Sequence, residues 1–278
     1  MPRVLIAGCG YVGAAAGDRF HEAGWKVEGW TASVESATKL SSRPYPVRAV
    51  DVTSAHGSGN FDVVIHCVSS RGGDENEYRR LYFEGAKNLL RAFPQATVLF
   101  TSSTSVYAQT DGSVVDENSP AEPRHAKGQI LRETEDLVQA AGGIVARLAG
   151  IYGPGRSYFL TRFLEGSISD RPERLINQVH RDDIVSALLL LAYRRGEFRG
   201  EIFNVVGDEP IKASEAYAWL SSRLKKPLPA ATNAQSVSKR GQSNKRVSNR
   251  KLRAVGWEPR YPNFESAMRE NVLPSFGF

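Results

Sequence analysis

Hydrophobic and polar positions along the first half of the chain form short apolar runs separated by longer amphipathic stretches. The first run, residues 4–7, is followed by a helical stretch over about 12–23 and by a second strand at 26–30. The later runs that we interpret as strands lie at residues 46–50, 62–67, 97–101, 144–148 and 202–205. The longest helical stretches between them lie at residues 74–93 and 124–141. Continuous apolar runs are typical of parallel strands buried on both faces, so this order predicts an α/β protein with a doubly wound parallel sheet.

The regular alternation of strands and helices ends near residue 150, where Gly153, Pro154 and Gly155 predict a rigid turn. Residues 179–184 introduce an apolar helix, and we expect Asp182 to be its N-cap. We therefore divide the chain into one domain at residues 1–150 plus about 176–204, and a small C-terminal lobe at about 151–175 plus 205–278.

Three glycines follow the first strand at the spacing G-x-G-x-x-G and lead directly into the first helix. In this context Gly8 makes the tight turn, Gly10 lets the backbone approach a pyrophosphate, and Gly13 lets the helix pack closely on the strand. The amides of Tyr11 and Val12, at the N-terminus of the helix, would contact the phosphates. The pattern predicts a dinucleotide-binding site, and a glycine-rich turn without a ligand is the alternative.

The end of the second strand indicates which dinucleotide is bound. A carboxylate there would hydrogen-bond the ribose 2′-hydroxyl of NAD, but the sequence has Thr31 and Ser33 in that place. Their hydroxyls could bind a 2′-phosphate, with Lys39 or Arg43 close by. We therefore expect NADP as the cofactor, with NAD as the alternative.

The loops after the other strands complete the expected cofactor site, because ligands of open α/β sheets bind at the carboxyl ends of the strands. We expect Asp51 and Val52 beside the adenine. The residues expected on the nicotinamide side are Val68, Ser69 and Thr101, and Cys67, directly before Val68, is also expected to bind the cofactor.

The cysteine content and the hydropathy pattern indicate the cellular compartment in which the protein is expected. Cys9 and Cys67 both fall in expected core elements, so we interpret them as free buried thiols in a reducing cytoplasm. Neither has the neighbours that a metal site requires. The sequence enters a strand at once and has no apolar run of membrane-spanning length, which predicts a cytoplasmic protein without a signal peptide.

The net charge of +6 is concentrated near the C-terminus, where residues 205–278 contain 13 Lys and Arg against 6 Asp and Glu. Seven basic residues and no acidic residue lie within 237–253. This stretch is either an anion-binding surface or a solvated basic face. Nucleic-acid binding is not expected, since the stretch has no aromatic residue to stack on bases.

Taken together, these segments resemble the extended short-chain dehydrogenase/reductase family, also called NAD-dependent epimerases/dehydratases. The matching pieces, in the order of the family, are GCGYVG, DVVIHCVSS, GAKNLLRAF, TSSTSVYA, ARLAGIYGPGR, VHRDDI and EIFNVVGDEP. The resemblance implies a Rossmann fold whose C-terminal lobe binds the substrate. It also implies a homodimer formed by the helices at 74–93 and 124–141.

The chain departs from this family at the catalytic motif Tyr-x-x-x-Lys. None of its ten tyrosines has a lysine four residues later. His125 lies at the family's tyrosine position and Gln129 at the lysine position, whereas Ser103 matches the catalytic serine. Imidazole titrates near neutral pH, so His125 and Ser103 could form a substitute acid/base pair. The alternative is that His125 only begins a helix. Gln129 could still hydrogen-bond ribose hydroxyls.

Two functions remain open at this point. The first is an NAD(P)-dependent oxidoreductase or epimerase/dehydratase acting on a small polar, possibly sugar-derived substrate, with Tyr152 and Arg156 in the substrate site. The second is a catalytically inactive sensor or regulatory protein that binds NADP(H). The retained Ser103 favours the enzyme, and the missing tyrosine and lysine favour the sensor.

Overall fold

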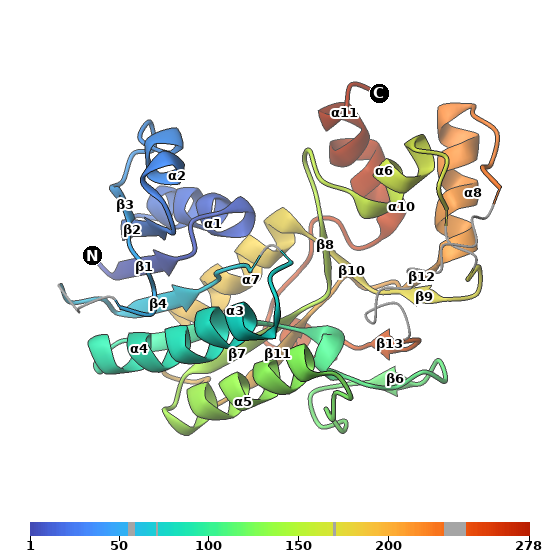
Figure 1. Ribbon diagram of the computed structural model, residues 1–278. Coiled ribbons are helices and arrows are strands. Elements are labelled where there is room, and N and C mark those ends of the chain that lie inside the picture. The colour runs from blue at the N-terminus through green and yellow to red at the C-terminus, as the bar shows by residue number, and fades with distance from the viewer. Residues whose placement is uncertain (55–58, 71, 169–170, 231–242) are drawn as a thin grey trace. The chain divides into compact units, whose positions relative to one another are not determined.

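A computed structural model describes residues 1–54, 59–70, 72–168, 171–230 and 243–278 of the chain, and its centre is a seven-stranded parallel sheet (Figure 1). The strand order is β11-β7-β5-β4-β1-β2-β3. The strands are β1 Arg3–Ala7, β2 Lys26–Thr31, β3 Val47–Ala49, β4 Val63–His66, β5 Thr97–Ser103, β7 Ile144–Leu148 and β11 Ile202–Val205. The predicted α/β class with a doubly wound parallel sheet is confirmed.

The central strands are buried because their sequences are apolar on both faces. Val4, Leu5 and Ile6 have no exposed surface, and neither do the residues of β4 that pair with them. The parallel register places Ala7 of β1 beside both Trp30 and His66. Consequently the loops that leave β1, β2 and β4 begin next to one another, along one edge of the sheet.

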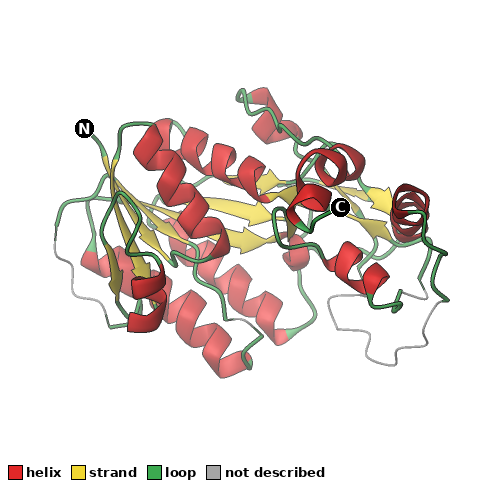
Figure 2. Cartoon of the chain, turned by 90° about the horizontal axis from the view of Figure 1, so that it is seen from above, coloured by secondary structure: helices red, strands yellow, loops and turns green. Residues whose placement is uncertain are grey.

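Helices cover both faces of this sheet (Figure 2). They are α1 Tyr11–Glu22, α2 Val34–Lys39, α3 Glu75–Arg79, α4 Gly85–Ala92, α5 Ala126–Ala140 and α7 Arg181–Tyr193. The helix expected over 74–93 is continuous from α3 to α4, but its middle, η1 Arg80–Glu84, is a turn of π-helix. A short 3-10 turn, η2 Thr104–Val106, follows β5.

The chain forms two compact units by its contacts. The first consists of residues 1–106, 121–147 and 185–203, and contains most of the large sheet. The second consists of residues 107–120, 148–184 and 204–278. The division counts residues 107–120 and 176–184 with the C-terminal part, whereas the sequence placed both segments in the first domain.

The second unit has its own hydrophobic core, in which Tyr152, Phe163, Tyr217 and Leu220 are buried. Its strands are β6 Val114–Val115, β8 Gly150–Tyr152, β9 Leu175–Ile176, β10 Gln178–His180, β12 Ile211–Lys212 and β13 Arg246–Val247. Its helices are α6 Tyr158–Leu164, α8 Ala213–Leu224, α9 Arg250–Ala254, α10 Phe264–Ala267, η4 Met268–Val272 and α11 Leu273–Ser275. The second unit therefore has the buried hydrophobic core that is typical of a folded domain.

The beginning of α7 differs from the prediction. Asp182 is not the N-cap, because the helix already begins at Arg181. His180 precedes it, and its Nδ1 accepts a hydrogen bond from the backbone N–H of Asp182 at 3.2 Å. The buried imidazole therefore satisfies an amide of the first turn, where the sequence suggested a carboxylate.

None of the helices within the described residues has both the length and the hydrophobicity that crossing a membrane requires.

Candidate functional site

The loop after β1 makes its tight turn at Gly8, whose φ of +104° favours glycine. A Cβ on Gly8 would lie 2.5 Å from the carbonyl carbon of Cys67, in the loop after β4. A Cβ on Gly13 would lie 2.2 Å from the carbonyl oxygen of Gly8. Both positions therefore exclude any side chain, because the backbone of the loop, the helix and the neighbouring strand meet there.

Gly10 has the opposite environment. It is exposed, and a Cβ placed on it would have nothing within 4 Å. It is the N-cap of α1, it contributes no side chain to the cap, and no acidic residue lies in the first turn. A 12-residue helix therefore begins at an open, uncrowded backbone with Tyr11 and Val12 in its first turn, an arrangement that fits a pyrophosphate.

The residues expected on the nicotinamide side lie directly after β4 and near the carboxyl end of β5, at the same edge of the sheet. Cys67 is half-buried, and its thiol donates to the carbonyl oxygen of Gly8 at 3.2 Å. Burial raises the pKa of this thiol well above its usual value, so it stays neutral. Val68 and Ser69 follow it, and Ser69 is exposed. Thr101 lies on β5 and donates to the carbonyl oxygen of His66 at 3.1 Å.

Asp51 and Val52 follow β3 and differ in exposure. The Asp51 carboxylate accepts hydrogen bonds from the backbone N–H and the hydroxyl of Thr53, and pairs with Arg80 at 3.0 Å. Burial acts to raise the pKa of Asp51, but the hydrogen bonds and the positive charge of Arg80 outweigh it, so the pKa is lowered. Val52 is buried and presents an apolar side chain.

The hydroxyls at the end of β2 have local partners. Thr31 donates to the carbonyl oxygens of Ser33 and Arg48, at 3.1 and 3.4 Å. Ser33 is the N-cap of α2, and its oxygen accepts from the N–H of Ser36 at 3.2 Å.

The two cations expected near a 2′-phosphate are also partnered, since Lys39 pairs with Glu35 at 2.6 Å and Arg43 pairs with Asp18. The hydroxyls and cations that the sequence offered for a 2′-phosphate therefore all have partners within the protein.

The three candidate catalytic residues lie on two elements of the first unit that pack together, β5 and α5. Ser103 is the last residue of β5, and its Oγ accepts from the N–H of Ser105 at 3.2 Å. His125 is the N-cap of α5, and Gln129 lies one turn further along and is exposed. His125 and Gln129 therefore share a face of the helix.

The hydrogen bond that His125 makes determines its tautomer. Its Nδ1 accepts from the backbone N–H of Gly128 at 2.9 Å. An accepting Nδ1 leaves the proton of the neutral ring on Nε2. His125 thus begins the helix, as one interpretation of the sequence had it, and the neutral ring carries an N–H donor at Nε2.

Two contacts around this site had no signal that sequence reasoning could use. Lys127 donates to the carbonyl oxygen of Gly73 at 2.5 Å and lies over the ring of Tyr78. Glu135 of α5 is fully buried, accepts from Ser102 of β5, and pairs with Arg147 of β7 at 2.7 Å. The second contact fixes α5 to the strand that ends at Ser103.

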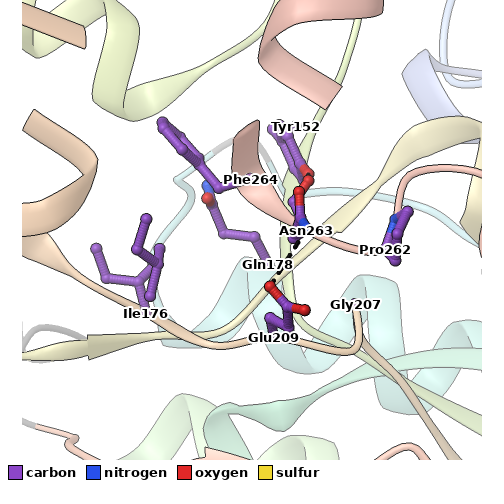
Figure 3. A pocket seen from close by; sticks show the side chains of 9 residues that line it. Tyr152, Ile176, Gln178, Gly207, Glu209, Pro262, Asn263 and Phe264 are labelled. Carbon is purple, nitrogen blue, oxygen red and sulfur yellow. Dashed lines mark hydrogen bonds between the residues drawn. The ribbon is translucent and has the colours of Figure 1, made fainter. Parts of the chain in front are cut away.

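The predicted substrate residues lie in the second unit. Tyr152 is 2 % exposed, and its hydroxyl donates to the carbonyl oxygen of Asn263 at 3.3 Å. Burial raises the pKa of Tyr152 well above its usual range. The ring lines a cavity of about 10 Å³ with Gln178, Glu209 and Phe264 (Figure 3), which is room for about one water molecule. Arg156 is exposed, in the turn after β8.

A larger hollow of about 440 Å³ lies beside this cavity, and the two share Glu209, Ile211, Asn263 and Phe264. The residues that line the hollow include Glu209, Glu215 and Glu265. Within the part of the chain that the structure describes, no group of His, Cys, Asp and Glu side chains has the arrangement of a metal site.

Comparison with known proteins gives the chain a family and several relatives. The family model described as the NAD dependent epimerase/dehydratase family matches residues 4–206. Protein YeeZ of Escherichia coli (strain K12) is 28 % identical over 282 residues, covering 95 % of this chain and 97 % of that protein. A conserved protein of unknown function from Silicibacter pomeroyi DSS has 25 % identity and a TM-score of 0.79, with 97 % of each chain covered.

Among more distant solved structures, the UDP-glucuronic acid 4-epimerase from Bacillus cereus, in complex with NAD, has a TM-score of 0.84 at 16 % identity. The match covers 99 % of this chain and 98 % of the epimerase. At this identity the likeness concerns the fold alone.

Proposed function

The chain belongs to the NAD dependent epimerase/dehydratase family, and on that premise we propose that it is an NAD(P)-dependent oxidoreductase of the epimerase/dehydratase type. Its substrate is a small polar molecule, which we take to be sugar-derived because a structural neighbour is a UDP-glucuronic acid epimerase. The observation that carries the proposal is the open backbone at Gly10, between two glycine positions that admit no side chain. This is the local geometry that a dinucleotide pyrophosphate requires.

In this proposal the first unit holds the cofactor, and the second unit contributes the substrate site with Tyr152 and Arg156. The amides of Tyr11 and Val12 bind the pyrophosphate, Asp51 and Val52 flank the adenine, and Cys67, Val68, Ser69 and Thr101 line the nicotinamide side. When bound, the nicotinamide supplies hydride acceptance or donation.

Ser103 and His125 act on the substrate oxygen. The Nε2–H of His125 donates to that oxygen, because Nδ1 is already an acceptor in the helix cap. Ser103 positions the same oxygen by hydrogen bonding. Gln129 contributes an amide to the ribose hydroxyls, in place of the family's lysine.

Binding of the cofactor is tested by a matched pair of glycine variants. Gly10→Val is expected to remain folded with a melting temperature only slightly below that of the wild type, since the side chain meets nothing and valine is only a poorer N-cap, and to abolish NADPH binding in calorimetry. Gly13→Val is expected to destabilise the fold itself, because its Cβ would clash with the Gly8 carbonyl. Normal NADPH affinity in the Gly10→Val variant would show that the loop does not bind a dinucleotide.

We further propose that NADP is preferred over NAD, because Thr31 stands where an NAD-binding protein has a carboxylate. Thr31→Asp should weaken NADPH binding and shift preference toward NADH, by repulsion of the 2′-phosphate. Thr31→Asn, which is similar in size and neutral, is the control. Tighter binding of NADH than of NADPH by the wild type would contradict the preference.

A second candidate function, an inactive NADP(H) sensor, is favoured by one observation: no Tyr-x-x-x-Lys motif exists in the sequence. Incubation of the purified protein with NADPH and a metabolite mixture separates the two functions. Turnover of a hydroxyl or carbonyl compound supports the enzyme. Tight NADPH binding without turnover of any such compound supports the sensor.

A further inference from the structure

The second unit contains a buried lysine that no proposed function has used. Lys245 precedes β13 and is 4 % exposed. Its Nζ donates to the carbonyl oxygen of Tyr107 at 2.8 Å. One carbonyl satisfies one of the three N–H donors of an ammonium group, and a carbonyl carries no negative charge to balance it.

The charged group that acts on Lys245 is another cation, Arg174. Burial, and then the positive charge of Arg174, lower the pKa of Lys245 to about 8. The Nε of Arg174 is buried and has no hydrogen-bond partner within the described residues. The positive charge of Arg174 therefore acts on Lys245, and Arg174 has a buried donor without a hydrogen-bond partner among these residues.

No carboxylate among the described residues forms an ion pair with either side chain. Among the described residues, the ionisable groups that act on Arg174 are Arg171 and the phenols of Tyr158 and Tyr217, none of which is a carboxylate. Arg171 adds a third positive charge. The protein thus supplies no counterion in the part that the structure describes.

The two segments that carry Arg174 and Lys245 are joined by hydrogen bonds of neighbouring residues. Leu175, the residue after Arg174, donates its N–H to the side chain of Asn244, the residue before Lys245, at 2.9 Å. In return, Asn177 donates its side-chain amide to the carbonyl oxygen of Lys245 at 2.9 Å and accepts from the N–H of Val247 at 2.8 Å. Reciprocal asparagine contacts on both sides hold the segments that carry the charges.

Holding two cations together in a desolvated place is unfavourable unless an anion joins them. We propose that Lys245 and Arg174 form a binding site for an oxyanion, namely a phosphate or carboxylate group of a small molecule. The lysine supplies a point charge, and the arginine supplies charge-assisted hydrogen bonds, including that of its buried Nε. This gives a ligand to part of the basic stretch at 237–253, of which residues 237–242 lie outside the described residues.

The existence of this oxyanion site does not depend on the proposed function. The assignment of the oxyanion to the substrate does rest on the proposed function. If both hold, the substrate carries a phosphate or carboxylate group in addition to the hydroxyl or carbonyl that reacts.

The site is tested on the full-length protein with two probes, pyrophosphate and citrate, against chloride at equal ionic strength. Pyrophosphate could also enter the glycine-rich loop, so every titration is repeated in the Gly10→Val variant. We expect one or both probes to bind and to raise the melting temperature in the two backgrounds alike. Binding of pyrophosphate alone identifies a phosphate site, and binding of citrate alone identifies a carboxylate site.

Lys245→Met and Arg174→Gln should each weaken probe binding by roughly tenfold or more, the loss expected for one charge-assisted contact. Arg246→Gln is the matched control, because Arg246 is the next residue and is exposed, and it should bind as the wild type does. If Lys245→Met does not fold, Arg174→Gln decides. No probe binding beyond chloride in either background, or unchanged binding in Arg174→Gln, overturns the proposal. Loss of NADPH binding with retained probe binding would instead remove the proposed function and leave the site.

Discussion

His125 combines two tasks that an alanine substitution would remove together. It caps α5 through Nδ1, and in our proposal it serves the substrate through Nε2. His125→Ala should therefore cost about 1 kcal/mol of folding stability, as the loss of a helix cap does. Turnover should fall by about a hundredfold or more, the usual effect of removing one hydrogen-bond donor to a reacting oxygen.

His125→Asn separates these tasks, because asparagine is a good N-cap but has no donor at the position of Nε2. We expect this variant to unfold at the same denaturant concentration as the wild type and yet to lose turnover like His125→Ala. NADPH affinity should stay unchanged in both variants. Full turnover in His125→Asn would limit the residue to its capping task.

Individual residues were predictable from the sequence to different degrees, for physical reasons. The environments of Gly8, Gly10 and Gly13 follow from their spacing after a strand, since the motif is local. The capping task of His125 is not the common choice, because Ser, Thr, Asp and Asn dominate N-caps. The nearness of Arg174 and Lys245 was not readable at all, because it depends on contacts between segments about 70 residues apart.

At the level of elements, α5 is fixed to the sheet by a buried ion pair. Glu135 has no exposed surface, and it contacts Arg147 of β7 and Ser102 of β5. Arg132 also pairs with Glu135, so removing Arg147 leaves the buried carboxylate with one cation in place of two. We expect Arg147→Met to lower the free energy of unfolding by about 1.5–3 kcal/mol in urea titrations, the loss of charge-assisted hydrogen bonds to a buried carboxylate.

The paired variant Glu135→Leu with Arg147→Met removes the buried carboxylate as well, so it should be clearly more stable than Arg147→Met alone. If the double variant is as unstable as Arg147→Met, the loss of stability comes from lost packing and not from the buried charge. Because Ser102 precedes Ser103, Arg147→Met should also disturb the proposed catalytic serine.

The elements that the sequence predicted are those with long apolar runs. The bounds of strands such as β1 and β4 and of helices such as α5 were predicted within one or two residues, because a pattern of apolar residues within each segment itself indicates its burial. The two-residue strands β6, β9, β12 and β13 were not predicted, since each exists only through its partner: β6 pairs with β13 and β9 with β12. The π turn at Arg80–Glu84 likewise has no periodic signal.

For the whole molecule, the homodimer remains our prediction. The two helices expected at its interface, residues 74–93 and 124–141, carry apolar stripes, of which Ala86, Leu89, Ile130 and Val138 are already buried within the single chain. The remaining ones, Leu81, Leu90 and Leu137, are half-buried. The single chain has a mass of 30.5 kDa, and we expect light scattering at micromolar concentration to give twice this mass. Leu81→Lys should convert the dimer to a monomer. A wild-type monomer would show that these side chains only cover the sheet.

The path of the chain between the two units limits how the gene can be divided. The chain changes unit after residues 106, 120, 147, 184 and 203. A fragment that ends near residue 150 would lack 185–203, and with it most of α7 and the beginning of the edge strand β11. Neither unit is therefore a transferable module, and a stop codon anywhere before β11 should yield a product that the cell degrades.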